Sequence, residues 1–189
     1  MGDLIKSTNS SLERVNSKLS RINNKLVNDH EAVLKNHWVK RLKELWQEKR
    51  YHQIIYEATS QIEHSPQFLL AYLYRGAAFG ELKRYEEAIQ DYSKAIEINP
   101  KYAKAFNNRG AAFSRLNHHE KAIQDFTKAI EINPELLIAY QNRALAFTEL
   151  NKHEEAIRDF TKAVEINPEY TGTYTGDTFS LRKMSIFID

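Results

Sequence analysis

A proline recurs at intervals of 34 residues along this chain, at Pro66, Pro100, Pro134 and Pro168. The segment that leads to each of the last three prolines is also repeated with few changes, in residues 85–100, 119–134 and 153–168. A fixed period of this length is typical of a stacked array of small units and not of a single globule. The period therefore restricts the fold before any single residue is considered.

Two patterns at helical spacing occupy each period. In the first, a glycine or alanine lies between two aromatic residues, and its copies are Tyr72, Gly76 and Phe79, then Phe106, Gly110 and Phe113, then Tyr140, Ala144 and Phe147. In the second, an aromatic residue lies between two alanines, and its copies are Ala88, Tyr92 and Ala95, then Ala122, Phe126 and Ala129, then Ala156, Phe160 and Ala163. Small side chains let two helices approach closely, so we expect the rings of one helix to enter gaps beside the small residues of the other. The Asn-Pro pair that follows is suited to ending the second helix.

These residues resemble the tetratricopeptide repeat. Three full units cover residues 69–170, and residues 35–68 form a fourth, degenerate unit in which Gln61 stands where a small residue belongs. The resemblance implies an all-α fold, a short right-handed solenoid of antiparallel helix pairs. The spacing of apolar residues in residues 1–34 separately predicts an N-terminal amphipathic or coiled-coil helix. It also implies that the first helix of each pair lines a concave groove, which binds a peptide or helix of a partner protein.

The residues that the resemblance places in the groove differ between units, whereas the packing residues do not. Such variation on a constant scaffold is expected of a surface that recognises a specific partner. Amides in this set are suited to hydrogen bonds with the backbone of an extended peptide, and the apolar residues to its side chains. The candidate groove residues are Tyr74, Lys104, Asn107, Asn108, Arg115, Ile138, Gln141, Asn142 and Leu145.

Family members that bind the C-terminal tails of chaperones hold the terminal carboxylate with a set of lysine, asparagine and arginine residues. Here Asn108 matches one asparagine of that set. The other four positions carry Leu73, Ala77, Ile138 and Asn142. Chaperone tails are therefore disfavoured, and we expect a neutral peptide of mixed character.

A second regularity concerns charge. Arg75, Arg109 and Arg143 share one helix position, and an aspartate follows each of them sixteen residues later. The degenerate unit keeps this chemistry as Arg41 and Glu57. The pattern predicts an ion pair within each unit. The alternative, a row of arginines for an anionic ligand, is disfavoured because a carboxylate accompanies every arginine.

Residues before the array follow a heptad pattern that is typical of a short coiled coil. Leucine at the first core position with β-branched residues at the second favours three or four chains over two. The alternative is an amphipathic helix that folds back on its own array. The residues expected to hold the oligomer together are Leu12, Val15, Leu19, Ile22 and Leu26.

The segment 171–189 begins where a further first helix is due, and Tyr174 falls at its aromatic position. Gly172, Gly176 and nearby threonines lower the helix propensity. This segment is therefore expected either to be irregular or to form a poor capping helix. The apolar residues available to such a cap are Leu181, Met184, Ile186 and Phe187.

The sequence contains little that suggests catalysis. It has no cysteine, no glycine-rich phosphate loop and no His-Glu-x-x-His motif, and His118-His119 lies at a turn whose residues differ between units. We expect no metal and no cofactor.

The net charge of +2 and the absence of a long apolar run predict a soluble, cytoplasmic protein with no membrane span and no nucleic-acid partner. The basic, aromatic residues 38–51 are interpreted as part of the core. The leading hypothesis is a non-catalytic adaptor that self-associates, and the alternative is a structural subunit buried in a larger assembly.

Overall fold

The structure is a computed structural model, and it describes residues 17–21, 25 and 36–167. The chain divides into two compact units, Met1–Glu48 and Lys49–Asp189, and each is described by itself. In the first unit, the described residues form a helical stretch at 17–21 and a helix at 36–47. Leu42 and Leu45 of the longer helix are fully buried.

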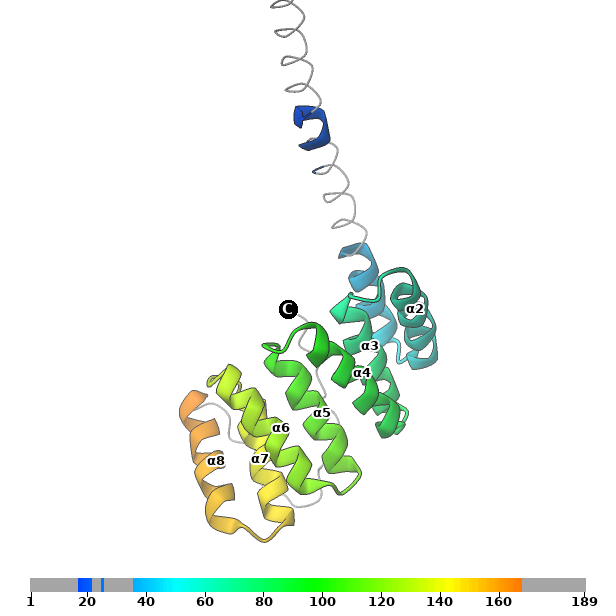
Figure 1. Ribbon diagram of the computed structural model, residues 1–189. Helices are drawn as coiled ribbons and strands as arrows, with labels where there is room; N and C mark the ends of the chain where they lie inside the picture. The colour runs from blue at the N-terminus through cyan, green and yellow to red at the C-terminus, as the bar shows by residue number, and fades with distance from the viewer. Residues whose placement is uncertain (1–16, 22–24, 26–35, 168–189) are drawn as a thin grey trace, which may run out of the picture. The chain divides into compact units, whose positions relative to one another are not determined.

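The described part of the second unit consists of α-helices joined by short turns (Figure 1). Each helix contacts the next along the chain, and α5 also contacts α3 and α7. The first helices of successive units therefore form one layer. This all-helical array confirms the predicted solenoid of helix pairs. Its helices are α2 (Tyr51–His64), α3 (Leu69–Glu81), α4 (Tyr85–Ile98), α5 (Ala103–Arg115), α6 (His119–Ile132), α7 (Leu137–Glu149) and α8 (His153–Ile166).

Helix pairs come into close contact at the predicted small residues. A Cβ atom added to Gly76 would lie 3.0 Å from a ring carbon of Tyr92 and 3.3 Å from the carbonyl oxygen of Ala88. At Gly110 the added atom would lie 2.7 Å from a ring carbon of Phe126. Real Cβ atoms essentially never show a contact as short as the one at Gly110 and seldom show those at Gly76, so the rings occupy most of the space that a side chain would need. The predicted interlocking of rings and small residues is confirmed.

The turn inside each pair has a left-handed residue that is not glycine. The φ angles are 60° at Lys83 and 58° at both Asn117 and Asn151. In each case the next backbone N–H donates to a carbonyl of the preceding helix, as from Arg84 to Phe79 at 2.9 Å. This is the Schellman pattern, which satisfies carbonyls at a helix end.

The turn between pairs is closed by asparagine. Asn99, Asn133 and Asn167 each follow the last residue of a second helix. The side-chain oxygen of Asn99 accepts a hydrogen bond from the backbone nitrogen of Lys101 at 3.0 Å, and that of Asn133 accepts one from Glu135 at 3.1 Å. The predicted end of the second helix at the Asn-Pro pair is confirmed.

The predicted ion pairs are present in all three full units. Arg109 donates from Nε and Nη2 to the two carboxylate oxygens of Asp125, both at 2.8 Å. Its Nη1 donates to Oγ of Ser93 in the preceding unit at 3.1 Å, and its guanidinium lies 5.6 Å from the ring centre of Phe106. The same pair of hydrogen bonds joins Arg75 to Asp91 and Arg143 to Asp159.

In the degenerate unit the candidate charges have other partners close by in sequence. Arg41 lies 3.7 Å from Glu44 within the first compact unit. Glu57 accepts a hydrogen bond from Gln53 at 3.0 Å within α2 of the second. The pairing of Arg41 with Glu57 stays a prediction.

We predict that Arg109→Ala lowers the free energy of unfolding by about 3 kcal/mol, because it leaves the buried carboxylate of Asp125 without its cation. Chemical denaturation of the purified variant measures the loss. The matched control is Lys128→Ala, whose exposed pair with Glu131 is open to solvent and should contribute little. Equal midpoints for the two variants would contradict the prediction. Replacing both partners, as Arg109→Met with Asp125→Leu, should recover much of the loss.

Candidate functional site

The nine predicted groove residues lie on three helices of one layer, α3, α5 and α7. Tyr74 is on α3, while α5 and α7 carry four residues each. Their burial is uneven. Tyr74, Asn107 and Gln141 are buried, and the other six are partly buried. We call these nine residues the helix A face, where helix A is the first helix of each pair.

Three asparagines of the helix A face bond to one another. Asn142 on α7 donates to the side-chain oxygen of Asn107 on α5 at 3.0 Å. Asn107 in turn donates to the side-chain oxygen of Asn108 at 3.2 Å, and it is only 6% exposed. The sequence suggested that these amides would meet a partner's backbone. The structure shows that Asn107 joins two neighbouring units, and its contact with a partner stays a prediction.

Gln141 differs from the asparagines. It is 6% exposed, and within the described residues its Nε2 has no hydrogen-bond partner. Ile138 and Leu145 lie on the same side of α7, one turn before it and one turn after it, and both are partly buried. A buried amide donor without an acceptor costs free energy. The face therefore carries an unused donor between two apolar side chains.

The α3 and α5 part of the face combines charge with a buried phenol. Burial raises the pKa of Tyr74, with a further contribution from Tyr102 nearby. At the end of α3, burial raises the pKa of Glu81, while a hydrogen bond from Tyr51 and the charge of Arg115 act in the opposite direction. Lys104 and Arg115 stand near opposite ends of α5, so α5 contributes two cations to a face whose α7 part is neutral.

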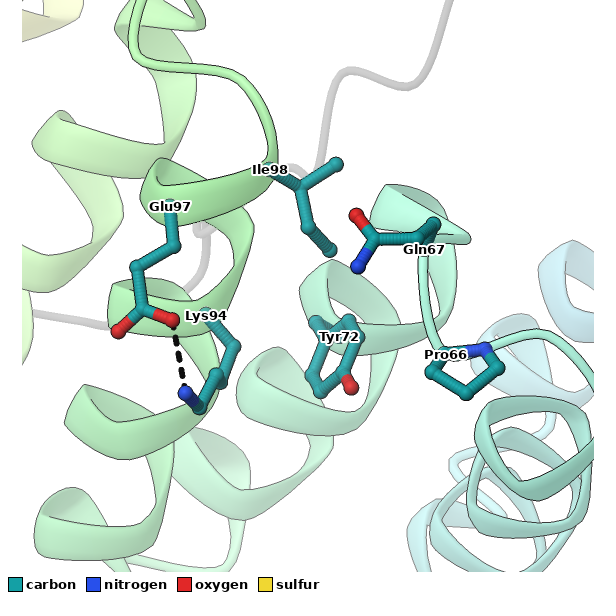
Figure 2. Close-up of a pocket in the computed structure, with 6 residues that line it drawn as sticks. All are labelled: Pro66, Gln67, Tyr72, Lys94, Glu97 and Ile98. Carbon is teal, nitrogen blue, oxygen red and sulfur yellow. Dashed lines mark hydrogen bonds and ion pairs between the residues drawn. The ribbon is translucent and has the colours of Figure 1, made fainter.

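A shallow hollow lies elsewhere on the array (Figure 2). Its volume is about 230 Å³, and Lys94 and Glu97 on its rim are joined at 2.7 Å. The same pair recurs one period later as Lys128 and Glu131 at 2.8 Å. The hollow thus belongs to the repeated scaffold, and its charges are already paired. Its six residues are Pro66, Gln67, Tyr72, Lys94, Glu97 and Ile98.

Of the five residues predicted to hold the oligomer together, the structure describes Leu19. Leu19 lies in the helical stretch 17–21 and is 57% exposed. Leu12, Val15, Ile22 and Leu26 lie outside the described residues, as does the predicted C-terminal cap.

The described ranges hold no group of three or more His, Cys, Asp or Glu side chains arranged to bind a metal ion. None of their helices is long and apolar enough to cross a membrane.

Comparison with known proteins shows the family to which the chain belongs. A family pattern described as TPR repeat matches residues 76–117, and one described as tetratricopeptide repeat matches residues 103–136 and 138–170. The chain belongs to the tetratricopeptide repeat family. No curated protein sequence matches it.

Solved structures with this fold include a crystal structure of MamA, with 26% identity and a TM-score of 0.65 over 70% of this chain and 77% of MamA. The TPR domain of OM64 from Arabidopsis is 32% identical, with a TM-score of 0.54 over 55% of this chain and 85% of that domain. The first TPR of Spaghetti (RPAP3), bound to the HSP90 peptide SRMEEVD, is 30% identical, with a TM-score of 0.54 over 56% of this chain and 83% of that one.

We predict that Asn107→Ala lowers the free energy of unfolding by roughly 1–3 kcal/mol, because it leaves the amides of Asn142 and Asn108 without their common partner. Chemical denaturation measures the change. Gln124→Ala is the control, since it removes an exposed amide on α6 and should leave the midpoint nearly unchanged. A midpoint for Asn107→Ala that equals the control would show that the bonded amides contribute nothing to the array.

Proposed function

We propose that this protein is a non-catalytic adaptor whose helix A face binds an extended peptide of a partner protein. The observation that carries the proposal is the buried Nε2 of Gln141, which has no acceptor among the described residues and lies between two apolar side chains. A peptide backbone offers a carbonyl oxygen at every residue, and an incoming carbonyl would satisfy this donor. The fold supports the proposal, because the similar TPR of RPAP3 was solved with a bound peptide.

The composition of the face indicates the character of the peptide. On α7, Ile138 and Leu145 suit apolar side chains, while Asn108 on α5 suits a polar residue at the next step along the peptide. Variation of these positions from unit to unit is consistent with recognition of one particular sequence. We therefore propose a neutral partner segment of mixed character, with an apolar residue over α7 and a polar one over α5.

A terminal carboxylate is not the expected feature of this partner. Of the five positions that hold it in chaperone-binding members, only Asn108 matches, and two of the others, Leu73 and Ala77, are buried apolar residues here. The peptide SRMEEVD is therefore a useful negative probe. It should not bind this chain at concentrations that saturate the RPAP3 domain.

The binding test starts from peptides selected from a random displayed library on the immobilised full chain. We predict that Gln141→Met weakens binding of the selected peptides by at least ten-fold while unfolding at the same or a higher denaturant concentration, because the change removes a buried donor that lacks a partner. Isothermal titration and chemical denaturation measure the two effects. Gln124→Met on α6 is the matched control and should alter neither.

Two outcomes would overturn the proposed site. The first is that the selected peptides bind Gln141→Met, and also Leu145→Ser, as tightly as the parent chain. The second is that the library yields no peptide whose binding depends on any residue of the helix A face. Either result would place recognition on another surface.

We also propose that copies of the chain associate through the heptad residues of the N-terminal segment. The 57% exposure of Leu19 supports this, because an apolar stripe on a single helix is poorly stable in water without a partner. Light scattering on the full chain should give a mass above that of one 22.1 kDa chain. Leu19→Glu with Ile22→Glu should restore the monomer mass, whereas Lys18→Glu should not. A monomer mass for the parent chain would contradict self-association.

A further inference from the structure

The hydrogen bonds among three asparagines of the helix A face run in one direction. The side-chain nitrogen of Asn142 donates to the oxygen of Asn107, and the nitrogen of Asn107 donates to the oxygen of Asn108. Among the residues that the structure describes, the nitrogen of Asn108 therefore donates to no partner, and the oxygen of Asn142 accepts from none. We call these three residues the amide relay.

Burial of the middle residue fixes the two ends of the relay. Asn107 is 6% exposed, whereas Asn108 and Asn142 are only partly buried. A carboxamide that is not bonded can turn about its last torsion between two opposite orientations. If Asn108 turned, its nitrogen would face the nitrogen of Asn107. If Asn142 turned, its oxygen would face the oxygen of Asn107. Each turn replaces a hydrogen bond with a contact between like groups, so the relay opposes both.

The relay occurs once in the described array. Leu73 and Tyr74, one period before Asn107 and Asn108, are 2% and 1% exposed and carry no amide. One period after Asn107 stands Gln141, which has the unused donor described above. The relay thus joins α5 to α7, and its two open groups lie on two neighbouring helices of one layer. Packed helices lie about 8–10 Å apart, and an extended peptide advances about 3.3 Å per residue, so the two groups meet peptide positions about three residues apart.

We propose that Asn107 is a positioning residue for peptide recognition, which holds Asn108 with its nitrogen toward a peptide carbonyl and Asn142 with its oxygen toward a peptide N–H. This inference rests on the proposed function, in which the helix A face binds an extended peptide. It adds a requirement on the peptide backbone.

The residue over Asn142 must carry an N–H group, so proline and N-methylated residues are rejected at that position. The rejection arises because the oxygen of Asn142 is held in place and cannot turn away from a group that lacks a donor. Discrimination by an unfavourable contact of this kind is a general route to specificity. The partner segment is therefore one that keeps a backbone N–H over α7.

Backbone substitution in the peptide tests this requirement. The probes are library-selected peptides whose binding to the full chain depends on Gln141, with each backbone N–H replaced in turn by an ester oxygen. On the parent chain, one ester should weaken binding by at least ten-fold in isothermal titration. On Asn142→Ala the same ester should cost less than three-fold, because the oxygen that it opposes is gone. Gln124→Ala on α6 is the control and should keep the full ester penalty.

Two variants of Asn107 test its positioning role. Asn107→Ala leaves Asn142 free to turn, so the ester penalty should fall below three-fold. Asn107→Asp keeps an acceptor for the nitrogen of Asn142 and should retain the penalty of at least ten-fold. It also obliges Asn108 to donate inward and to turn its oxygen toward the peptide carbonyl, so the unmodified peptide should bind at least five-fold more weakly. Circular dichroism checks that both variants are folded, and a purely structural role would not separate them by their ester penalties.

Four results would overturn the inference and leave the proposed function in place. The first is that no ester costs more than three-fold on peptides that depend on Gln141. The second is a full penalty on Asn107→Ala, and the third is the loss of the penalty on Asn107→Asp. The fourth is a penalty that disappears with Asn108→Ala and persists with Asn142→Ala, which would show that the relay runs in the opposite direction. Peptides that bind without any residue of the helix A face would overturn the proposed function together with this inference.

Discussion

Close approach of the two helices in a pair is the constraint on which the array depends. It requires a very small residue where the ring of the other helix enters, which is Gly76 beside Tyr92, Gly110 beside Phe126, and Ala144 in the third pair. Once the helices are this near, an arginine on one helix can donate from two guanidinium nitrogens to the carboxylate of an aspartate on the other. The buried alanines of the second helices keep the same short separation. Packing, charge pairing and the course of the chain therefore follow from one steric condition.

Much of this fold could be predicted from the sequence because each feature occurs three times. The small residues, the rings, the arginine and aspartate sixteen residues apart, and the asparagine before proline all recur with the period. The left-handed turn at Lys83 and Asn117 could not be found in the same way, because two different residue types share one backbone conformation. Asparagine favours this conformation after a helix but lysine does not, so the residue type gives no consistent signal there.

The candidate site was less predictable than the scaffold, for a related reason. The helix A face differs between units, so no repetition shows how its side chains meet. The bond from Asn142 to Asn107 occurs once, between residues 35 positions apart, and depends on the spacing of α5 and α7. The buried donor of Gln141 likewise depends on the packing around α7, which the sequence does not specify. Sequence could name the residues of the face, but not which amides were already bonded and which donor was unused.

The third hydrogen bond of each arginine affects the array as a whole. Arg109 bonds to Ser93 as well as Asp125, and Arg143 bonds to Thr127 as well as Asp159, so each guanidinium joins two adjacent units. In a linear array, the strength of such junctions relative to the units decides whether the ends fray separately or the whole melts together. Because every junction among the full units includes a partly buried arginine bond, disorder in one unit removes a partner from the next. The full units should therefore lose their structure as one cooperative block, and a partner that holds one of them will also steady its neighbours.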